Sequence, residues 1–374
     1  MIRNVFGLIY AGEENHNLRD LVMHRSVAAL PVGGRYRAID FQLSNMVHSG
    51  IRNIGIITQK NYKSLMDHLG SGKDWDLSRK NNGLFMLPPY DTSQNTSLYH
   101  GICDAIYAKL DYVRRAPQEY CLLTGSYTIY STTYDEMMRA HIENNADITM
   151  LYNLDPPNTD AERFKEVRIE TDDSGRVCDI EFDSHIAKSH KLGMDIYLLK
   201  KSLLEYLIQS AVARGRYNFV SDVLIPNLHS LRVQAVEHQG YVGRLHSLLS
   251  YYDLNMDMLD ESVRWDLFHA GAPVYTKIKD EPPARYMATA QVTNSIVSDA
   301  CEIAGAVHGC VLSRGVTVGR NASLNGVIVM QDSQIQEDCV LENVIIDKYV
   351  TIHKGRHLIG APEFPVIIRK GAVI

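Results

Sequence analysis

Short apolar runs typical of buried strands alternate with helix-type stretches along the first two-thirds of the chain. The strand-type runs lie at residues 5–9, 53–58 and 120–124, and the helix-type stretches at 61–69, 102–114 and 134–144. This alternation predicts a mostly parallel sheet covered by helices. Ligands of such sheets bind at the carboxyl ends of the strands, so we expect a site in the loops after Ile9, Thr58 and Thr124.

Residues 147–199 carry a strand-rich pattern that includes a turn at Asp172-Asp173-Ser174-Gly175. Helical runs at 201–213 and 247–260 follow. Prolines at 273, 282 and 283 then mark a linker. We therefore expect one domain over residues 1–265, a linker over 266–287 and a second domain over 288–374.

Beyond the linker, aliphatic residues recur about every six positions, with glycines and other small residues between them. The recurring residues are Val297, Ile303, Leu312, Val318, Leu324, Ile335, Leu341, Ile346, Ile352 and Leu358. A period of six predicts a parallel β-helix, whereas a β-sandwich would show a period of two.

Composition narrows the class of protein. The chain of 374 residues is 45% hydrophobic and 22% charged, as is usual for a soluble globular protein, and its net charge of -6 argues against nucleic-acid binding. The N-terminus lacks the layout of a signal peptide, and no apolar run approaches the length of a membrane span. The six cysteines show no CxxC spacing, which favours reduced thiols and a cytoplasmic location.

The loop after the first strand has the position of a phosphate-binding loop but lacks the residues with which such a loop binds phosphate. Such a loop needs glycines, so that N–H groups approach phosphate oxygens, and a cation. Here Gly12 is followed by Glu13 and Glu14, whose carboxylates would repel phosphate. Likewise, the strand ending at Thr124 leads into Gly125-Ser126-Tyr127-Thr128, which offers no carboxylate for a metal.

Other polar residues leave two interpretations open. Arg35 and Arg37 suit phosphate, although one of them could simply pair with Asp40 and fix a turn. Gly101 would let a sugar or phosphate approach a helix N-terminus, or merely permit a turn. Three histidines of the β-helix region are more typical of surface residues than of an acyltransferase base: His308, His353 and His357.

The order of these segments resembles the ADP-glucose pyrophosphorylase (glucose-1-phosphate adenylyltransferase) family along nearly the whole chain. The resembling segments are Gly33-Gly34-Arg35-Tyr36-Arg37-Ala38-Ile39-Asp40-Phe41-Gln42-Leu43-Ser44-Asn45, Ser49-Gly50-Ile51, Ile57-Thr58-Gln59, Leu87-Pro88-Pro89, Tyr99-His100-Gly101 with Asp104-Ala105, and Leu224-Ile225-Pro226. The resemblance implies an α/β fold: a Rossmann-like nucleotidyltransferase domain with a mostly parallel sheet, followed by a left-handed parallel β-helix. It also implies that Gly12, Gln59, Tyr99, Gly101 and Asp104 are remnants of a ligand pocket.

Several departures from the family pattern fall on its catalytic positions. The family's GGxGxRL loop is replaced by Gly12-Glu13-Glu14-Asn15-His16-Asn17-Leu18, so that Glu13 and Asn15 replace loop residues and Asn17 stands at the arginine. Val27 stands at a lysine, Ser126 at one magnesium aspartate and Arg244 at the other. The lysine that grips the sugar phosphate has no counterpart after Glu181-Phe182-Asp183. These positions are therefore expected to be degenerate, with no catalytic residue and no metal ligand.

The resemblance is closest to GlgD-type subunits, which implies a regulatory and catalytically inactive partner of a catalytic GlgC-type subunit in a hetero-oligomer, expected to be a tetramer. Mg²⁺ would then be required by the catalytic partner, and this chain would bind no cofactor. The resemblance also implies that Arg25, Arg37, Arg314 and Arg369 form an effector site for a phosphorylated metabolite or nucleotide, or a subunit contact. The alternatives are an active, divergent sugar-phosphate nucleotidyltransferase and a metal-free ligand sensor.

Overall fold

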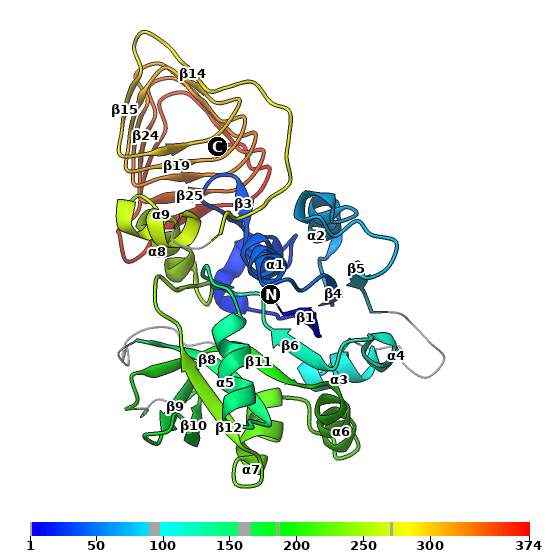
Figure 1. Cartoon of the computed structure of the whole chain (residues 1–374). Coiled ribbons are helices and arrows are strands. Elements are labelled where there is room, and N and C mark those ends of the chain that lie inside the picture. The colour runs from blue at the N-terminus through cyan, green and yellow to red at the C-terminus, as the bar shows by residue number, and fades with distance from the viewer. Residues whose placement is uncertain (1, 90–97, 156–165, 185, 187, 270–271) are drawn as a thin grey trace.

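The computed structural model describes residues 2–89, 98–155, 166–184, 186, 188–269 and 272–374. Figure 1 shows a sheet domain covered by helices, with a three-sided β-helix packed against one end of it. No helix in these described ranges is both long enough and apolar enough to cross a membrane.

A nine-stranded sheet forms the centre of the N-terminal domain. Its strands are β1 (Val5–Ala11), β4 (Asn53–Thr58), β5 (Gly83–Leu87), β6 (Tyr120–Thr124), β8 (Ile148–Leu154), β9 (Val167–Thr171), β10 (Val177–Phe182), β11 (Lys191–Lys200) and β12 (Val233–Glu237). β1 pairs in parallel with β4 and β6, whereas β11 runs antiparallel to β6 and β8. The predicted mostly parallel sheet is confirmed. The ends of β1, β4 and β6 lie at one edge, where a site was expected.

Helices cover both faces of this sheet (Figure 1): α1 (Ala38–His48), α2 (Lys63–Leu69), α3 (Ile102–Tyr107), α4 (Leu110–Arg115), α5 (Asp135–Glu143), α6 (Lys201–Val212) and the short α7 (Ile225–Asn227). Two further helices, α8 (Leu248–Asp257) and α9 (Glu261–Phe268), lie beside the β-helix. The expectation of one helix over residues 102–114 is wrong, because the chain turns between α3 and α4. At this turn the Lys109 N–H donates to the Ile106 carbonyl, and Lys109 Nζ donates to the Pro88 carbonyl.

Short elements connect these layers. They are the 3₁₀ helices η1 (His16–Val22), η2 (Val27–Ala29) and η3 (Lys73–Trp75), the π-helix η4 (Val220–Leu224), and the strand pairs β2 (Pro31–Val32) with β3 (Tyr36–Arg37) and β7 (Thr128–Ile129) with β13 (Gly243–Arg244).

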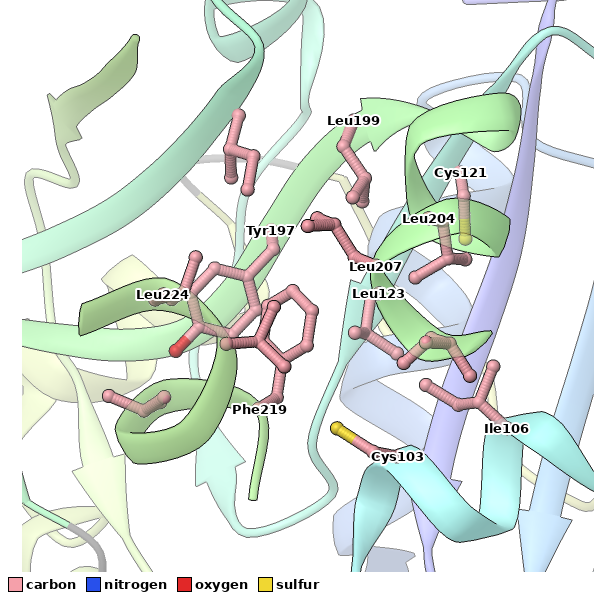
Figure 2. Close-up of a cluster of buried hydrophobic side chains, with 14 of the residues drawn as sticks. Cys103, Ile106, Cys121, Leu123, Tyr197, Leu199, Leu204, Leu207, Phe219 and Leu224 are labelled. Carbon is pink, nitrogen blue, oxygen red and sulfur yellow. The ribbon is translucent and has the colours of Figure 1, made fainter. Parts of the chain in front are cut away.

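The largest core of this domain lies between β6, β11 and the helices α3 and α6 (Figure 2). The rings of Tyr197 on β11 and Phe219 lie 5.1 Å apart within it. Cys103 and Cys121 are buried there as free thiols, whose pKa values are raised by burial. This core fixes β6 and β11, the two strands whose ends frame the candidate site.

Three parallel five-stranded sheets form the faces of the β-helix. The first contains β14 (Arg285–Tyr286), β17 (Glu302–Ile303), β20 (Thr317–Val318), β23 (Gln334–Ile335) and β26 (Thr351–Ile352). The second contains β15 (Gln291–Thr293), β18 (Ala306–His308), β21 (Ser323–Asn325), β24 (Val340–Glu342) and β27 (His357–Ile359). The third contains β16 (Ile296–Val297), β19 (Val311–Leu312), β22 (Ile328–Val329), β25 (Val344–Ile346) and β28 (Val366–Ile368).

The register of these sheets explains the aliphatic repeat. Ile303, Val318, Ile335 and Ile352 lie one above another on successive coils, and all four are buried. The predicted β-helix is confirmed. Its first strand, β14, lies within the stretch that we expected to be a linker.

The β-helix shares a core with the N-terminal domain. Val311, Ile328, Met330 and Ile345 pack in one buried cluster with residues of η1, α1 and α8. Tyr252 on α8 donates a hydrogen bond of 2.8 Å to the Gly326 carbonyl. In addition, Arg25 Nη2 lies 2.7 Å from Asp347 Oδ1, and both side chains are almost fully buried. The interface between the two domains is therefore packed like a protein core and contains a buried ion pair.

Candidate functional site

The loop after β1 is held closed by its own side chains. Asn15 Oδ1 accepts a hydrogen bond from the Asn17 N–H, which caps η1. Asn15 Nδ2 donates to the carbonyls of Leu245 and His246, at 3.2 and 2.9 Å. The loop is thereby tied to the segment after β13, and the Asn15 amide is committed to structural bonds.

Glu13 lies inside the site at the ends of β1 and β6. Ser126 Oγ donates a hydrogen bond of 3.2 Å to Glu13 Oε2, and both residues are buried. A fixed carboxylate therefore contacts the residue that stands at the family's first metal position. An incoming phosphate would meet negative charge there, in a partly dry environment that screens it weakly.

Arg244 lies beside the same loop. The pairing of β13 with β7 sets Arg244 opposite Thr128, and the Leu245 N–H donates to the Tyr127 carbonyl. The Arg244 guanidinium donates to Asn153 Oδ1 at 2.6 Å and lies 3.9 Å from Asp155 Oδ2. Burial lowers the pKa of Arg244 and the Asp155 carboxylate opposes that shift, so an arginine there keeps its proton.

Asp195 is a member of this site that sequence reasoning missed. It lies on β11, and its Oδ2 lies so close to Gly125 that a Cβ on that residue would clash with it. Asp195 also has a φ of +59°, which is uncommon for a residue with a side chain. A strained aspartate one strand away from the loop is a signal of tertiary structure, which a single sequence does not reveal.

The donor set does not fit Mg²⁺ as this family would hold it. Mg²⁺ takes hard oxygen ligands in octahedral geometry. By the family resemblance, Ser126 and Arg244 are expected at the positions of the two aspartates, and the Arg244 guanidinium brings a fixed positive charge. Among the residues that the structure describes, no three His, Cys, Asp or Glu side chains gather closely enough to hold a metal ion. We therefore derive no metal-dependent step at this site.

Other side chains also lie where the family resemblance places lysines, including the lysine that grips the sugar phosphate. Phe182, at the end of β10, packs against the main core. Asp183 Oδ1 accepts a 2.6 Å hydrogen bond from the Glu166 N–H. Val27 is buried in the core shared by the two domains. None of these three side chains offers a cation to a phosphate.

The expected pocket remnants contact neighbouring groups of the protein. Tyr10 Oη donates to Gln59 Oε1 at 3.3 Å, and Gln59 Nε2 donates to the Tyr99 carbonyl at 3.2 Å. Asp104 accepts a hydrogen bond from the His100 N–H, and the Tyr217 carbonyl closes off Gly101. Gly12 lines a small cavity of about 280 Å³ next to Arg25 and Lys60. The old ligand groups thus remain, but they are engaged within the protein.

Three of the four effector candidates line a cavity of about 460 Å³ between the domains, here called the cationic cavity: Arg25, Arg37 and Arg314. Among the described residues, six further cations line it: Arg35, which sequence reasoning identified as a phosphate candidate, and Lys63, Lys277, Lys279, Lys348 and Lys370, which it missed. Asp67 is the only acidic residue that lines the cavity within the described ranges. Arg369 is exposed and does not line it, whereas its neighbour Lys370 does.

The cations of this cavity are held in different ways. Arg37 Nη1 donates to Ser64 Oγ at 2.7 Å, while Asp40 accepts from the Arg37 backbone N–H. The alternative of an Arg37 side chain paired with Asp40 is thus wrong. Arg314 is 7% exposed, and within the described part of the chain its Nε has no hydrogen-bond partner. Burial, together with Arg37 and Arg25, lowers the pKa of Lys348 to about 7.

The histidines of the β-helix do not form a cluster of catalytic type. His308, His353 and His357 are exposed, and His308 Nδ1 bonds to Thr293 Oγ1 at 2.8 Å.

The sequence of the chain is similar to two family models and to several known proteins. A family model described as nucleotidyl transferase matches residues 6–261, and one described as GlmU-like, C-terminal hexapeptide matches residues 282–363. The chain is 33% identical over 374 residues to the glycogen biosynthesis protein GlgD of Bacillus subtilis (strain 168), covering 99% of this chain and 96% of that protein. It is 37% identical over 373 residues to GlgD of Geobacillus stearothermophilus, covering 100% and 98%. It is 32% identical over 326 residues to the glucose-1-phosphate adenylyltransferase of G. stearothermophilus, covering 86% and 83%.

Proposed function

The chain belongs to the ADP-glucose pyrophosphorylase family of nucleotidyl transferases, and we propose that it acts in glycogen biosynthesis as a regulatory, catalytically inactive subunit. In this role it associates with a catalytic subunit that makes ADP-glucose from ATP and glucose 1-phosphate. The catalytic partner would supply the Mg²⁺ site, and this chain would modulate the partner's activity.

One observation supports this proposal most strongly. Charged side chains of the protein lie where the phosphates and the metal ion of the reaction would be expected to bind. The Glu13 carboxylate contacts Ser126, and the Arg244 guanidinium lies on the adjacent strand, bonded to Asn153. Electrostatic stabilisation at a transition state depends on groups aimed at developing charge. Here the equivalent positions carry the opposite charge or none, while the scaffold around them is intact.

The cationic cavity supports a regulatory role. Of the described residues, nine cationic ones and one acidic one line a space of about 460 Å³, in a chain whose net charge is -6. Such a concentration of positive charge attracts anions and suits phosphate groups in particular. We propose this cavity as the site of an anionic effector, a phosphorylated metabolite or nucleotide. The same observation favours the second candidate function, a ligand sensor that works without a metal.

Replacing Arg314 by alanine is expected to weaken effector binding by about tenfold or more, because the change removes a buried cation with an unused donor. The matched control is Arg369→Ala, which removes an exposed arginine outside the cavity. The readout is the concentration of phosphorylated metabolite that gives half of the maximal response in the mixed oligomer. Equal responses from both variants and the unmodified chain would contradict the site.

Binding of sulfate is expected to weaken as the pH rises from 6 to 8. Lys348 has a folded-state pKa of about 7, so it is charged below that value and neutral above it. Each lost charge removes attraction for an anion, and sulfate itself keeps its charge over this range. Calorimetric titration at pH 6, 7 and 8 measures the effect, and Lys348→Met should flatten the profile. A profile with the same slope in that variant would assign the pH dependence to other groups.

The association itself is tested by native mass measurement of the chain with and without a catalytic relative such as a glucose-1-phosphate adenylyltransferase from the same organism. The proposal predicts a mixed oligomer whose activity or metabolite response differs from that of the catalytic subunit alone. Absence of any complex, or a complex with unchanged kinetics, would refute the regulatory role.

A further inference from the structure

A second interdomain cavity, here called the α8 groove, has a different chemistry from the cationic cavity. It has a volume of about 640 Å³ and lies between the outer side of α8, the β13 region and the segment of the β-helix that contains Phe364. Its volume is within the range of about 300–1,000 Å³ that is usual for small-molecule sites. It adjoins the degenerate site, because Arg244 lines it, but the anionic effector does not account for it.

One wall of the groove carries carboxylates. Asp253 and Asp257 lie one turn apart on α8, and Tyr241 Oη donates a hydrogen bond of 2.7 Å to Asp257 Oδ2. Burial and the nearby Asp257 raise the pKa of Asp253 to about 6. Asp155, just after β8, and Glu363, from the β-helix, add two further carboxylates. Together these groups accept hydrogen bonds and repel phosphate.

The remaining walls carry two arginines, Arg19 and Arg244, and an aromatic face. Phe364 is 75% exposed, so its phenyl ring is accessible to a ligand. Arg19 has φ of +48° and ψ of −127°, a sparsely populated backbone conformation that tends to occur at functional positions. Arg19 is exposed, and its guanidinium supplies hydrogen-bond donors to the same groove as the carboxylates of α8.

This combination selects one class of ligand. Four carboxylates outnumber the two arginines among the described residues of the groove, and Arg244 is already bonded to Asn153, so a phosphorylated compound would be repelled. A purely apolar compound would leave the carboxylates unsatisfied. A neutral ligand that carries many hydroxyl groups can donate to the carboxylates, accept from Arg19 and lay an apolar C–H face on Phe364. We infer that the α8 groove binds a neutral oligosaccharide, such as a segment of an α-glucan chain.

Maltoheptaose is the probe that tests this inference, with binding followed by calorimetric titration of the full chain. The unmodified chain is expected to bind it. Phe364→Ala, and the double variant Asp253→Asn with Asp257→Asn, are each expected to bind at least about tenfold more weakly. Tyr206→Ala is the matched control, because it removes an aromatic ring of similar exposure on α6 that does not line the groove, and it should bind like the unmodified chain.

Two results would overturn the inference. One is the absence of maltoheptaose binding at millimolar concentration, or equal binding by all variants. The other is displacement of maltoheptaose by equimolar glucose 1-phosphate, which would identify a phosphate site. The inference does not depend on the regulatory role: the groove variants are expected to modulate the catalytic subunit as the unmodified chain does, so each idea fails separately.

Discussion

The purified chain, given ATP, glucose 1-phosphate and Mg²⁺, is expected to form ADP-glucose at least about 10⁴ times more slowly than a catalytic relative. Loss of one electrostatic group typically costs on the order of 10² to 10³ in rate. By the family resemblance, both metal aspartates, the loop arginine and the sugar-phosphate lysine are expected to be replaced here. These losses are not additive, so the joint loss is smaller than their product. We therefore take about 10⁴ as the minimum expected decrease in rate. Release of pyrophosphate measures the rate.

The informative control restores the two aspartates alone, by Ser126→Asp together with Arg244→Asp. This variant is expected to remain inactive. Glu13 would still face the first aspartate, Asn17 and Phe182 would still offer no cation, and Asn15 would still hold the loop closed. Recovery of activity in that double variant would show that the metal ligands were the only barrier, contrary to the joint loss that we describe.

Replacing Asp347 by alanine is expected to lower the free energy of unfolding by about 3–5 kcal/mol. Arg25 and Asp347 are 3% and 2% exposed, and their side-chain atoms lie 2.7 Å apart. Without the carboxylate, the Arg25 guanidinium would stay buried in a cavity that already holds other cations. An unpaired buried charge has a much greater cost than a lost surface pair. Urea denaturation of the two proteins measures the difference.

The control for this prediction is an exposed ion pair of the same β-helix. Glu337→Ala removes the carboxylate that lies 3.2 Å from Lys354 Nζ at the surface, and no measurable change in stability is expected. Saturating sulfate should restore part of the stability of Asp347→Ala, because the anion can replace the missing charge in the cationic cavity. Equal effects of the two substitutions would contradict the role of the buried pair as a link between the domains.

The fold could be predicted from local patterns, because its elements are periodic. Apolar runs located β1, β4 and β6, and the six-residue spacing located the β-helix whose coils stack Ile303 on Val318 and Ile335. The break between α3 and α4 could not be predicted in this way. It is accompanied by a tertiary bond, from Lys109 Nζ to the Pro88 carbonyl, within a segment whose apolar spacing is helical throughout.

In the candidate site, the sequence could predict only single positions at which this chain carries a different residue from the family. Ser126 and Arg244 were identified in that way. The contact of Glu13 with Ser126 and the approach of Asp195 to Gly125 required the tertiary structure. The cationic cavity shows the same limit: Lys277 and Lys348 come from segments far apart in the sequence and meet only where the two domains pack.

The most direct test of the central claim is the rate of ADP-glucose formation by a mixed oligomer in which the catalytic subunit has lost its own metal aspartates. In that assembly this chain carries the only site that could turn over, and it is in its natural surroundings. Our account predicts no turnover above background, while the same chain mixed with the intact catalytic subunit changes that subunit's rate or metabolite response. Sustained ADP-glucose formation by the oligomer with the inactivated catalytic subunit would contradict it.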